Sequence, residues 1–323
     1  MIPSAMADGV FAQVAEVEKF LRARLASDQS LLHSVCEYAF EAGGKRLRPC
    51  LTLVSGAMFG ASLESLLPAA AAVEMIHTAT LLHDDIMDAS PMRRGRTTVT
   101  RRWDPVTAVY TGDYILSRAF TLLSEYGRAD ILTTFSGVTS RLCAGEILQA
   151  RNRRNLSITV EEYLEIIDCK TAHFLACCCR VGGMAGDAPA EALSALSAYG
   201  TQIGLVFQIT DDLLDYLGDT RKTGKDVGAD FREGKYTLPV IMALRSGGPE
   251  AGRLRELLAS DDMSETAFRE AREAVIASGA AERAAAFAAE CTEAAKAALE
   301  ALPSGPDREA LRYFAEWIAR RST

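Results

Sequence analysis

The chain has 323 residues, of which 49% are apolar and 24% are charged, and its formal net charge is -8. This composition is typical of a soluble globular protein and excludes a disordered chain. The acidic balance argues against a nucleic-acid partner, because phosphate backbones bind basic surfaces. Any anionic ligand must therefore be held by local clusters of basic side chains.

The sequence also predicts where the protein is located in the cell and whether its cysteines are reduced. The first 20 residues lack the basic start, apolar run and cleavage site of a signal peptide, and no 18-residue apolar stretch is free of charge. We therefore expect a cytoplasmic protein with at most peripheral membrane contact. The eight cysteines include the run 177–179 but show no zinc-finger spacing, which predicts reduced, buried thiols on a helix.

Helical periodicity runs through almost the whole chain and predicts an all-α fold. Residues 160–178 and 267–302 carry apolar side chains at three- and four-residue spacing, with no sustained alternation of period two. The pattern predicts one domain over 1–323, with an alanine-rich helical part from about residue 247. Gly and Pro interrupt it at 41–49, 88–95, 127–130, 185–190, 247–252 and 302–307.

The first functional candidates in chain order are basic. The segment GGKRLRP supplies Lys45, Arg46 and Arg48 next to a Gly pair that lets the backbone approach an anion. A second cluster, RRGR at 93–96, includes Arg93 and Arg94. Two basic clusters suggest two anionic groups.

Two acidic pentads of the form D-D-x-x-D follow apolar segments. Helical spacing brings the three carboxylates of each pentad together, and their mutual repulsion calls for cations. Hard oxygen ligands without Cys or clustered His indicate Mg²⁺, which also binds substrate phosphates. Exposed acidic helix faces are the alternative reading. The pentads consist of Asp84, Asp85 and Asp88, and of Asp211, Asp212 and Asp215.

Neutral and basic side chains near the pentads complete the candidate site. His77 lies two helical turns before Asp84 and shares its face, and Gln208 lies three residues before Asp211. Lysines lie in an apolar helix and after the second pentad. Diphosphate-binding cations with neutral dipoles and apolar walls suit ionisation of an allylic diphosphate to a carbocation. The further candidates are Lys170, Thr171, Lys222, Lys225 and Lys235.

The chain resembles the trans-isoprenyl diphosphate synthases, the polyprenyl synthetase family, from about residue 40 to 245. The resemblance is carried in order by GGKRLRP, EMIHTATLLHDDIMDASPMRRG, TGDYILSRAF, AGEILQ, KTA, FQITDDLLD and GKDVGADFREGKYTLP. It implies a helical bundle around a central cavity, usually a homodimer, which condenses isopentenyl diphosphate with an allylic diphosphate. The departing diphosphate would accept the proton, so no side-chain base is expected.

The resemblance also implies a role for each matching residue. The two pentads would hold Mg²⁺, three ions per active site, on the allylic diphosphate. Isopentenyl diphosphate would bind Lys45, Arg48, His77 and Arg94. The allylic diphosphate would contact Arg93, Lys170, Lys225 and Lys235, with Thr171 and Gln208 close to the developing cation.

Product length is expected to depend on the residues one turn before the first pentad. These are Ala79 and Thr80, where bulky aromatics in the family close the cavity floor. Their small size resembles enzymes whose products exceed fifteen carbons, most closely the medium- and long-chain synthases, with geranylgeranyl synthases next. Three other classes remain open: a class I terpene cyclase, a subunit of a heteromeric synthase, and a structural helical protein that binds divalent ions.

Overall fold

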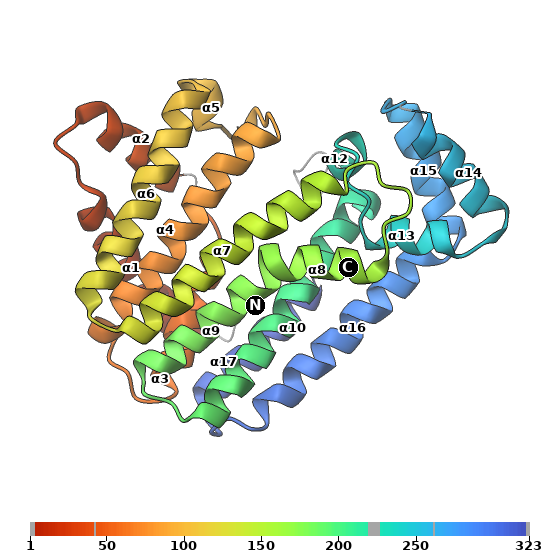
Figure 1. Ribbon diagram of the computed structural model, residues 1–323. Coiled ribbons are helices and arrows are strands. Elements are labelled where there is room, and N and C mark those ends of the chain that lie inside the picture. The colour runs from red at the N-terminus through yellow and green to blue at the C-terminus, as the bar shows by residue number, and fades with distance from the viewer. Residues whose placement is uncertain (1–3, 42, 219–226, 261, 321–323) are drawn as a thin grey trace. The chain divides into compact units, whose positions relative to one another are not determined.

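The computed structural model describes residues 4–41, 43–218, 227–260 and 262–320, which fall into two compact units. Unit 1 comprises residues 1–139, 177–197 and 302–311, and unit 2 comprises 140–176, 198–301 and 312–323. Most of the described residues of both units are helical and almost none are in strands, which confirms the predicted all-α class (Figure 1). Four helices contribute residues to both units. The single domain expected over 1–323 stays a prediction.

Unit 1 contains the first part of the chain, and the shared helices follow. Its own elements are α1 (Ser4–Leu25), α2 (Ser30–Glu41), α3 (Leu47–Ala57), α4 (Leu63–Met87), β1 (Met92–Arg93), β2 (Arg96–Thr97), α5 (Val99–Arg102) and α6 (Pro105–Tyr126). The shared helices are α7 (Ala129–Arg151), α9 (His173–Ala185), α10 (Ala190–Leu217) and α17 (Pro306–Ala319).

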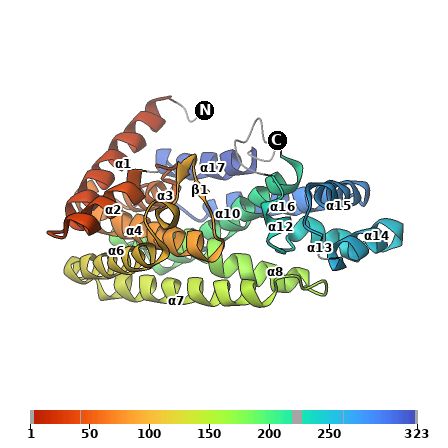
Figure 2. The same ribbon diagram turned by 90° about the horizontal axis from the view of Figure 1, so that it is seen from above.

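The described part of unit 2 contains one π-helix and six further helices of its own. These are α8 (Val160–Ile167), the π-helix η1 (Asp168–Ala172), α12 (Ala229–Arg232), α13 (Leu238–Arg245), α14 (Gly248–Ala259), α15 (Glu265–Ala277) and α16 (Ala280–Leu299). In Figure 2, α13, α14 and α15 lie together, and α13 packs on α14, α15 and α16. Of these helices, α14, α15 and α16 belong to the alanine-rich part that begins near residue 247.

Helix α4 is the central helix of unit 1. Its N-terminus is capped by Ser62, whose side chain accepts a hydrogen bond from the Ser65 backbone N–H. It packs against α1, α3 and most extensively α6, which runs beside it (Figures 1 and 2). It is long and apolar enough to cross a membrane, but 67% of its apolar window is buried, as in the core helix of a soluble protein. This packing fixes the helix that carries the first pentad.

A short β-hairpin occupies the predicted break at 88–95, and sequence periodicity did not predict its strands. β1 pairs antiparallel with β2, with Arg93 opposite Arg96. The two-residue loop consists of Arg94 and Gly95, with φ of 52° and 76°. Positive φ at both positions is what a type I′ hairpin turn requires. The turn therefore fixes the directions in which the arginines of this segment leave the backbone.

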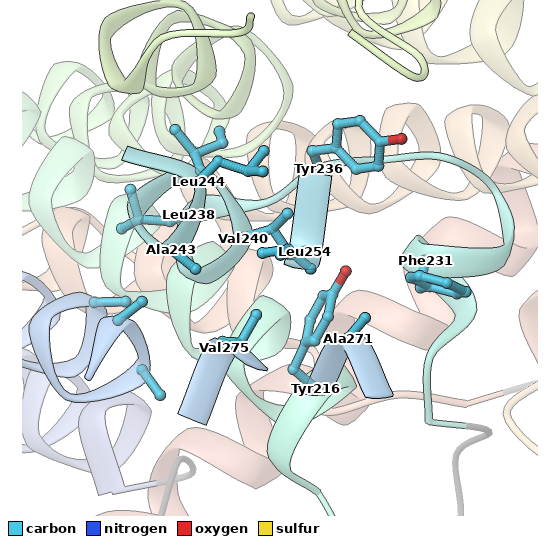
Figure 3. Packing of buried hydrophobic residues seen from close by; sticks show 14 of the residues in the cluster. Tyr216, Phe231, Tyr236, Leu238, Val240, Ala243, Leu244, Leu254, Ala271 and Val275 are labelled. Atoms are coloured by element: carbon cyan, nitrogen blue, oxygen red, sulfur yellow. The ribbon is translucent and has the colours of Figure 1, made fainter. Parts of the chain in front are cut away.

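The core of unit 2 surrounds the end of α10. Tyr216 of α10 is fully buried, and Figure 3 shows it beside Ala271 of α15. The Phe268 ring lies 5.8 Å from the Tyr216 ring and 5.6 Å from the Phe231 ring, centroid to centroid. Such tilted aromatic contacts are favourable beyond the apolar area that they bury. The helix end that carries the second pentad is thus anchored by aromatic packing.

The break predicted at 247–252 lies where α13 ends and α14 begins, with Gly247 as N-cap and Pro249 in the first turn of α14. Within the helical pattern of 267–302, Gly279 has a left-handed φ of 68° and separates α15 from α16. Within that of 160–178, the π-helix η1 lies between α8 and α9. Helical periodicity alone indicated neither of these two interruptions.

Candidate active site

Both acidic pentads lie at the C-terminal ends of long helices. Asp84 and Asp85 are in the last turn of α4 and Asp88 is its C-cap, whereas the second pentad lies in the last two turns of α10. The last turn of neither helix contains a basic residue. The negative end of a helix dipole disfavours carboxylates, by about 0.3–1 kcal/mol for each charge. Position and repulsion therefore both favour binding of a cation.

Asp85 is engaged by an arginine of the hairpin. The Arg93 Nε donates to Asp85 Oδ1 at 2.8 Å, and Arg93 Nη2 lies 2.7 Å from the same oxygen. Burial raises the pKa of Asp85, the Arg93 guanidinium lowers it, and the Asp88 carboxylate raises it again. In this arrangement Asp84 and Asp88, both partly exposed, are the carboxylates of the first pentad nearer to solvent.

The predicted basic loop of unit 1 meets the hairpin. Gly43 and Gly44 have positive φ, and Arg94 Nη1 donates to the Gly43 carbonyl. Gly44 has φ 144°, a backbone conformation that favours glycine over any other residue. Lys45 is exposed in the same loop. The structure thus brings together the two basic segments that the sequence placed about fifty residues apart.

Arg48 and His77 form the inner part of this cluster. Arg48 Nη1 lies 3.1 Å from His77 Nε2, and both side chains are partly buried. Burial lowers the pKa of His77 well below its ordinary value, and the arginines Arg48, Arg94, Arg46 and Arg93 lower it further. A neutral ring must accept from Arg48 through Nε2, which leaves Nδ1 as the protonated nitrogen.

The low pKa of His77 predicts a pH dependence of stability. The unfolded histidine binds a proton below about pH 6.5, whereas the folded one stays neutral. Its contribution to the free energy of unfolding is therefore present above about pH 6.5 and is lost as the pH falls, by at most about 1.4 kcal/mol per pH unit. Urea unfolding at pH 5 to 8 should show that the free energy of unfolding falls less on acidification for His77→Gln than for the wild type. The same dependence of this free energy on pH in both proteins would contradict the low pKa of His77.

Arg46 turns inward, in contrast to the expectation that it joins the anion-binding cluster. Its Nε donates to Glu18 at 2.7 Å, its Nη1 to Glu74, and its Nη2 to the Phe40 carbonyl at 3.0 Å. Its side chain is only 9% exposed. We call Arg46, Glu18 and Glu74 the buried ion triad. Lys45, in the loop, and Arg48, in the first turn of α3, are the basic side chains of this segment that we assign to an anion.

In unit 2, the π-helix η1 carries Lys170 and Thr171. Lys170 Nζ lies 2.8 Å from Glu146 Oε1 and donates to Gln149 Oε1, both on α7. α7 can approach because residue 145 is glycine: a Cβ there would lie 2.8 Å from Lys170 Cγ. π-helical turns occur frequently at functional sites, where they re-aim side chains.

A continuous chain of hydrogen bonds links Thr171 to the second pentad. The Thr171 hydroxyl donates to Gln208 Oε1 at 2.9 Å, and Gln208 Nε2 donates to Asp212 Oδ1 at 2.8 Å. The Tyr163 hydroxyl donates to Asp212 Oδ2 at 2.6 Å. Residue type and spacing predict Thr171 and Gln208 but not Tyr163, because no local signal links α8 to a residue 49 positions later.

Asp212 and Asp215 of the second pentad both accept hydrogen bonds within unit 2. Burial raises the pKa of Asp212 to about 7, the hydrogen bonds from Tyr163 and Gln208 lower it, and Asp211 and Asp215 raise it. Asp215 accepts hydrogen bonds from the backbone N–H groups of Ala229 at 3.1 Å and Asp230 at 3.0 Å. It thus caps α12, a role that the D-D-x-x-D spacing did not predict.

A further buried carboxylate of this region, Asp230, was not among the residues predicted from the sequence. Burial raises its pKa well above the ordinary value, and Asp212 and Asp215 raise it further, whereas Lys235 lowers it. Lys235 Nζ lies 2.5 Å from Glu233 Oε2. Lys222 and Lys225, the other lysines expected here, lie outside the described residues.

The geometry divides the predicted residues into two local groups. Unit 1 brings together the basic loop, Arg48, His77, the hairpin arginines and the first pentad. Unit 2 brings together Thr171, Gln208 and Asp212. Among the residues that the structure describes, no three His, Cys, Asp or Glu side chains form a preassembled metal-binding group. The donor set nevertheless fits Mg²⁺, since carboxylate oxygens without Cys or clustered His suit hard cations.

The residues proposed to set the chain length lie in α4, about one turn before the first pentad. Ala79 is 1% exposed, and Thr80 donates its hydroxyl to the His77 carbonyl at 2.8 Å. His83, one turn after Ala79, packs against Gly112 of α6. Ala79 therefore shares the α4 face that abuts α6, where a larger side chain would have to displace its neighbours.

Comparison with known proteins gives concordant matches. The family model described as polyprenyl synthetase matches residues 29–275. Octaprenyl diphosphate synthase of Escherichia coli (strain K12) is 35% identical over 308 residues, 95% of each chain. A short chain isoprenyl diphosphate synthase of Methanothermobacter thermautotrophicus is 38% identical over 290 residues, 88% of this chain and 89% of that one.

A solved structure is also similar to this chain. It is that of a polyprenyl synthase from Caulobacter crescentus CB15, complexed with calcium and isoprenyl diphosphate. It is 37% identical, covers 98% of this chain and 97% of its own, and gives a TM-score of 0.93. The similarity therefore extends through the whole fold.

Proposed function

Because the chain belongs to the polyprenyl synthetase family, we propose that it is a Mg²⁺-dependent trans-prenyltransferase that condenses isopentenyl diphosphate with an allylic diphosphate. The observation that carries this proposal is the pairing, within unit 1, of a basic cluster with an acidic pentad at a helix end. A binding protein for one cation would need only the carboxylates. The product is an all-trans polyprenyl diphosphate, and diphosphate is released.

Isopentenyl diphosphate is assigned to the basic cluster of unit 1. Lys45, Arg48 and Arg94 supply the positive charge, and the positive-φ glycines expose backbone beside them. His77 is neutral, so it serves as a hydrogen-bonding group that orients Arg48. These groups hold the diphosphate while the alkene end of the molecule remains free to react.

The allylic diphosphate is assigned to the pentads and to further cations. We assign Asp84, Asp88 and Asp211 as direct Mg²⁺ ligands because they are partly exposed at their helix ends, whereas Asp85 and Asp212 are buried and Asp215 caps α12 with both carboxylate oxygens. Bound Mg²⁺ would neutralise the charge that builds on the leaving diphosphate. The cationic partners of this group are Arg93, Lys170, Lys225 and Lys235.

The remaining chemistry falls to neutral dipoles and to the substrate itself. Thr171 and Gln208 present oxygen atoms that can stabilise a developing carbocation without quenching it. The departing diphosphate accepts the proton released when the new double bond forms. This arrangement separates the charged groups that hold diphosphate from the uncharged groups that face the cation.

The proposal is tested by product analysis of the purified protein. Labelled isopentenyl diphosphate is supplied with Mg²⁺ and with dimethylallyl, geranyl, farnesyl or geranylgeranyl diphosphate, and the product masses are read. Mg²⁺-dependent elongation is the expected result, and its loss with EDTA is the control. A cyclic hydrocarbon would favour a terpene cyclase. Incorporation only after addition of a second subunit would favour a heteromeric synthase.

The product is proposed to be longer than fifteen carbons, in the medium- or long-chain range, with geranylgeranyl diphosphate next. The small side chain of Ala79 and the similarity to an octaprenyl diphosphate synthase support this length. Ala79→Phe is therefore expected to shorten the products by at least one isoprene unit, read by mass spectrometry. Ala79→Val is the control for overpacking alone, and an unchanged distribution in both variants would place the floor elsewhere.

A homodimer is proposed as the working form. Residues Val106, Val109 and Tyr110 of α6 are 63%, 38% and 68% exposed in the single chain, and they share one helix face. Apolar patches of this kind mark protein–protein interfaces. Val106→Asp with Tyr110→Asp is expected to convert the dimer to monomer in light scattering. Cytoplasmic location and at most peripheral membrane contact stay predictions from the sequence.

A further inference from the structure

We infer that Tyr163 and Asp212 form a positioning pair that fixes which end of the Gln208 amide faces Thr171. This inference rests on the proposed function, because the benefit of a fixed amide is stabilisation of a developing carbocation. It also assigns Asp212 a role other than metal ligation. The four residues come from three elements of unit 2: α8, η1 and α10.

The directions of the hydrogen bonds leave one consistent arrangement. Asp212 accepts through both oxygens, from the Tyr163 hydroxyl at 2.6 Å and from Gln208 Nε2 at 2.8 Å. Only the NH₂ end of the Gln208 amide can donate to a carboxylate. Its carbonyl oxygen must therefore face the Thr171 hydroxyl, 2.9 Å away.

Tyr163 is needed because its hydroxyl fixes the carboxylate plane. Tyr163 and Asp212 are each 3% exposed, so an unpaired carboxylate oxygen there would be costly. Without the hydroxyl, Asp212 would turn toward its remaining donor or toward water, and the Gln208 amide would lose its fixed partner. The phenol thus acts on the reacting region through two intervening side chains.

The backbone around this chain is rigid enough to transmit the orientation. A Cβ on Gly204 would lie 2.3 Å from Ala172 Cα, and one on Gly200 would lie 2.4 Å from Ala176 Cα. The backbone of α10 therefore lies directly against η1 and the start of α9. This close approach holds Gln208, one turn after Gly204, beside Thr171.

Orientation matters because the two ends of an amide carry opposite partial charge. With Gln208 Oε1 accepting from Thr171, the hydroxyl oxygen keeps its lone pairs for an electron-poor carbon. With the amide reversed, an N–H would donate to that oxygen and occupy a lone pair. A reversed amide should slow ionisation without weakening diphosphate binding.

The first experiment compares steady-state kinetics of the wild type and Tyr163→Phe. We expect kcat to fall about tenfold, while both KM values and the Mg²⁺ concentration for half-maximal activity stay within about twofold. Tyr126→Phe is the matched control, because it removes a hydroxyl that donates at 2.7 Å to the Ser65 carbonyl in unit 1. Its kcat should not change. An unchanged kcat for Tyr163→Phe would overturn the inference.

The second experiment separates orientation from metal ligation. Asp212→Asn can accept from Tyr163 only by presenting its NH₂ to Gln208, so it favours the reversed amide. We expect a larger loss of kcat than for Tyr163→Phe, with an unchanged Mg²⁺ requirement. Asp211→Asn, the comparison variant, should raise the Mg²⁺ requirement. A similar rise for Asp212→Asn would overturn the positioning role.

A third measurement is independent of catalysis. A double-mutant cycle of Tyr163→Phe and Asp212→Asn, read by urea unfolding, should show coupling of at least about fivefold in the unfolding equilibrium constant. Additive effects would overturn the pair whether or not the protein has prenyltransferase activity. Absence of wild-type turnover with coupling intact would instead contradict the proposed function and leave the hydrogen-bonded pair supported.

Discussion

Asp84→Ala and Asp211→Ala are each expected to lower kcat/KM by at least about a thousandfold, which corresponds to about 4 kcal/mol of lost transition-state stabilisation. Both carboxylates are partly exposed at the ends of their helices. Their removal takes away a negative charge from the negative end of a helix dipole. Thermal stability without Mg²⁺ should therefore be unchanged or slightly higher, which separates a lost ligand from a lost fold.

The controls for this prediction come from the same chain. Asp187→Ala removes an exposed carboxylate that pairs with Arg128 at 3.1 Å, and it should leave turnover unchanged. Mg²⁺ should raise the melting temperature of the wild type and of Asp187→Ala more than that of Asp84→Ala, because a ligand stabilises the state that it binds. Near-normal activity in either pentad variant would contradict the metal assignment.

The fold class could be predicted because apolar periodicity reports directly on helical burial. Short segments that depart from regular α-helix could not be predicted from the same periodicity. The π-helix at Lys170 inserts one residue into a turn and leaves the apolar pattern almost unchanged, so periodicity does not detect it. The hairpin rests on positive φ at Arg94, a residue type that rarely adopts it. Gly279, in contrast, was a usable break signal within 267–302.

The site could be predicted by residue type and spacing, but the partner of each side chain could not. Arg46 and Arg48 are two residues apart, yet one enters the buried ion triad and the other contacts His77. The available signal was Glu74, a single carboxylate inside a long apolar run, which requires a buried cation. Asp212 and Tyr163 offered no such signal, because their contact depends on how α8 packs on α10.

Arg46→Met is expected to lower the free energy of unfolding by about 3–5 kcal/mol, since it leaves a buried carboxylate without its cation. Glu74 is 4% exposed, whereas the Glu18 side chain is 42% exposed and can turn to water. The adjoining cavity of about 10 Å³, roughly one water, could solvate Glu74 only in part. Urea denaturation measures the loss, and Arg22→Met is the control for a more exposed pair.

The double variant Arg46→Met with Glu74→Leu is expected to recover most of this stability, because replacing both members of a buried ion pair is often neutral or stabilising. Its KM for isopentenyl diphosphate should nevertheless stay at least about tenfold above that of the wild type. Arg46 has a left-handed φ of 46°, and its guanidinium holds that conformation through the Phe40 carbonyl as well as the two carboxylates. If stability and KM recovered together, the triad would be purely structural. Recovery of stability alone would show that the charges are there to hold Lys45 and Arg48 in position for the diphosphate.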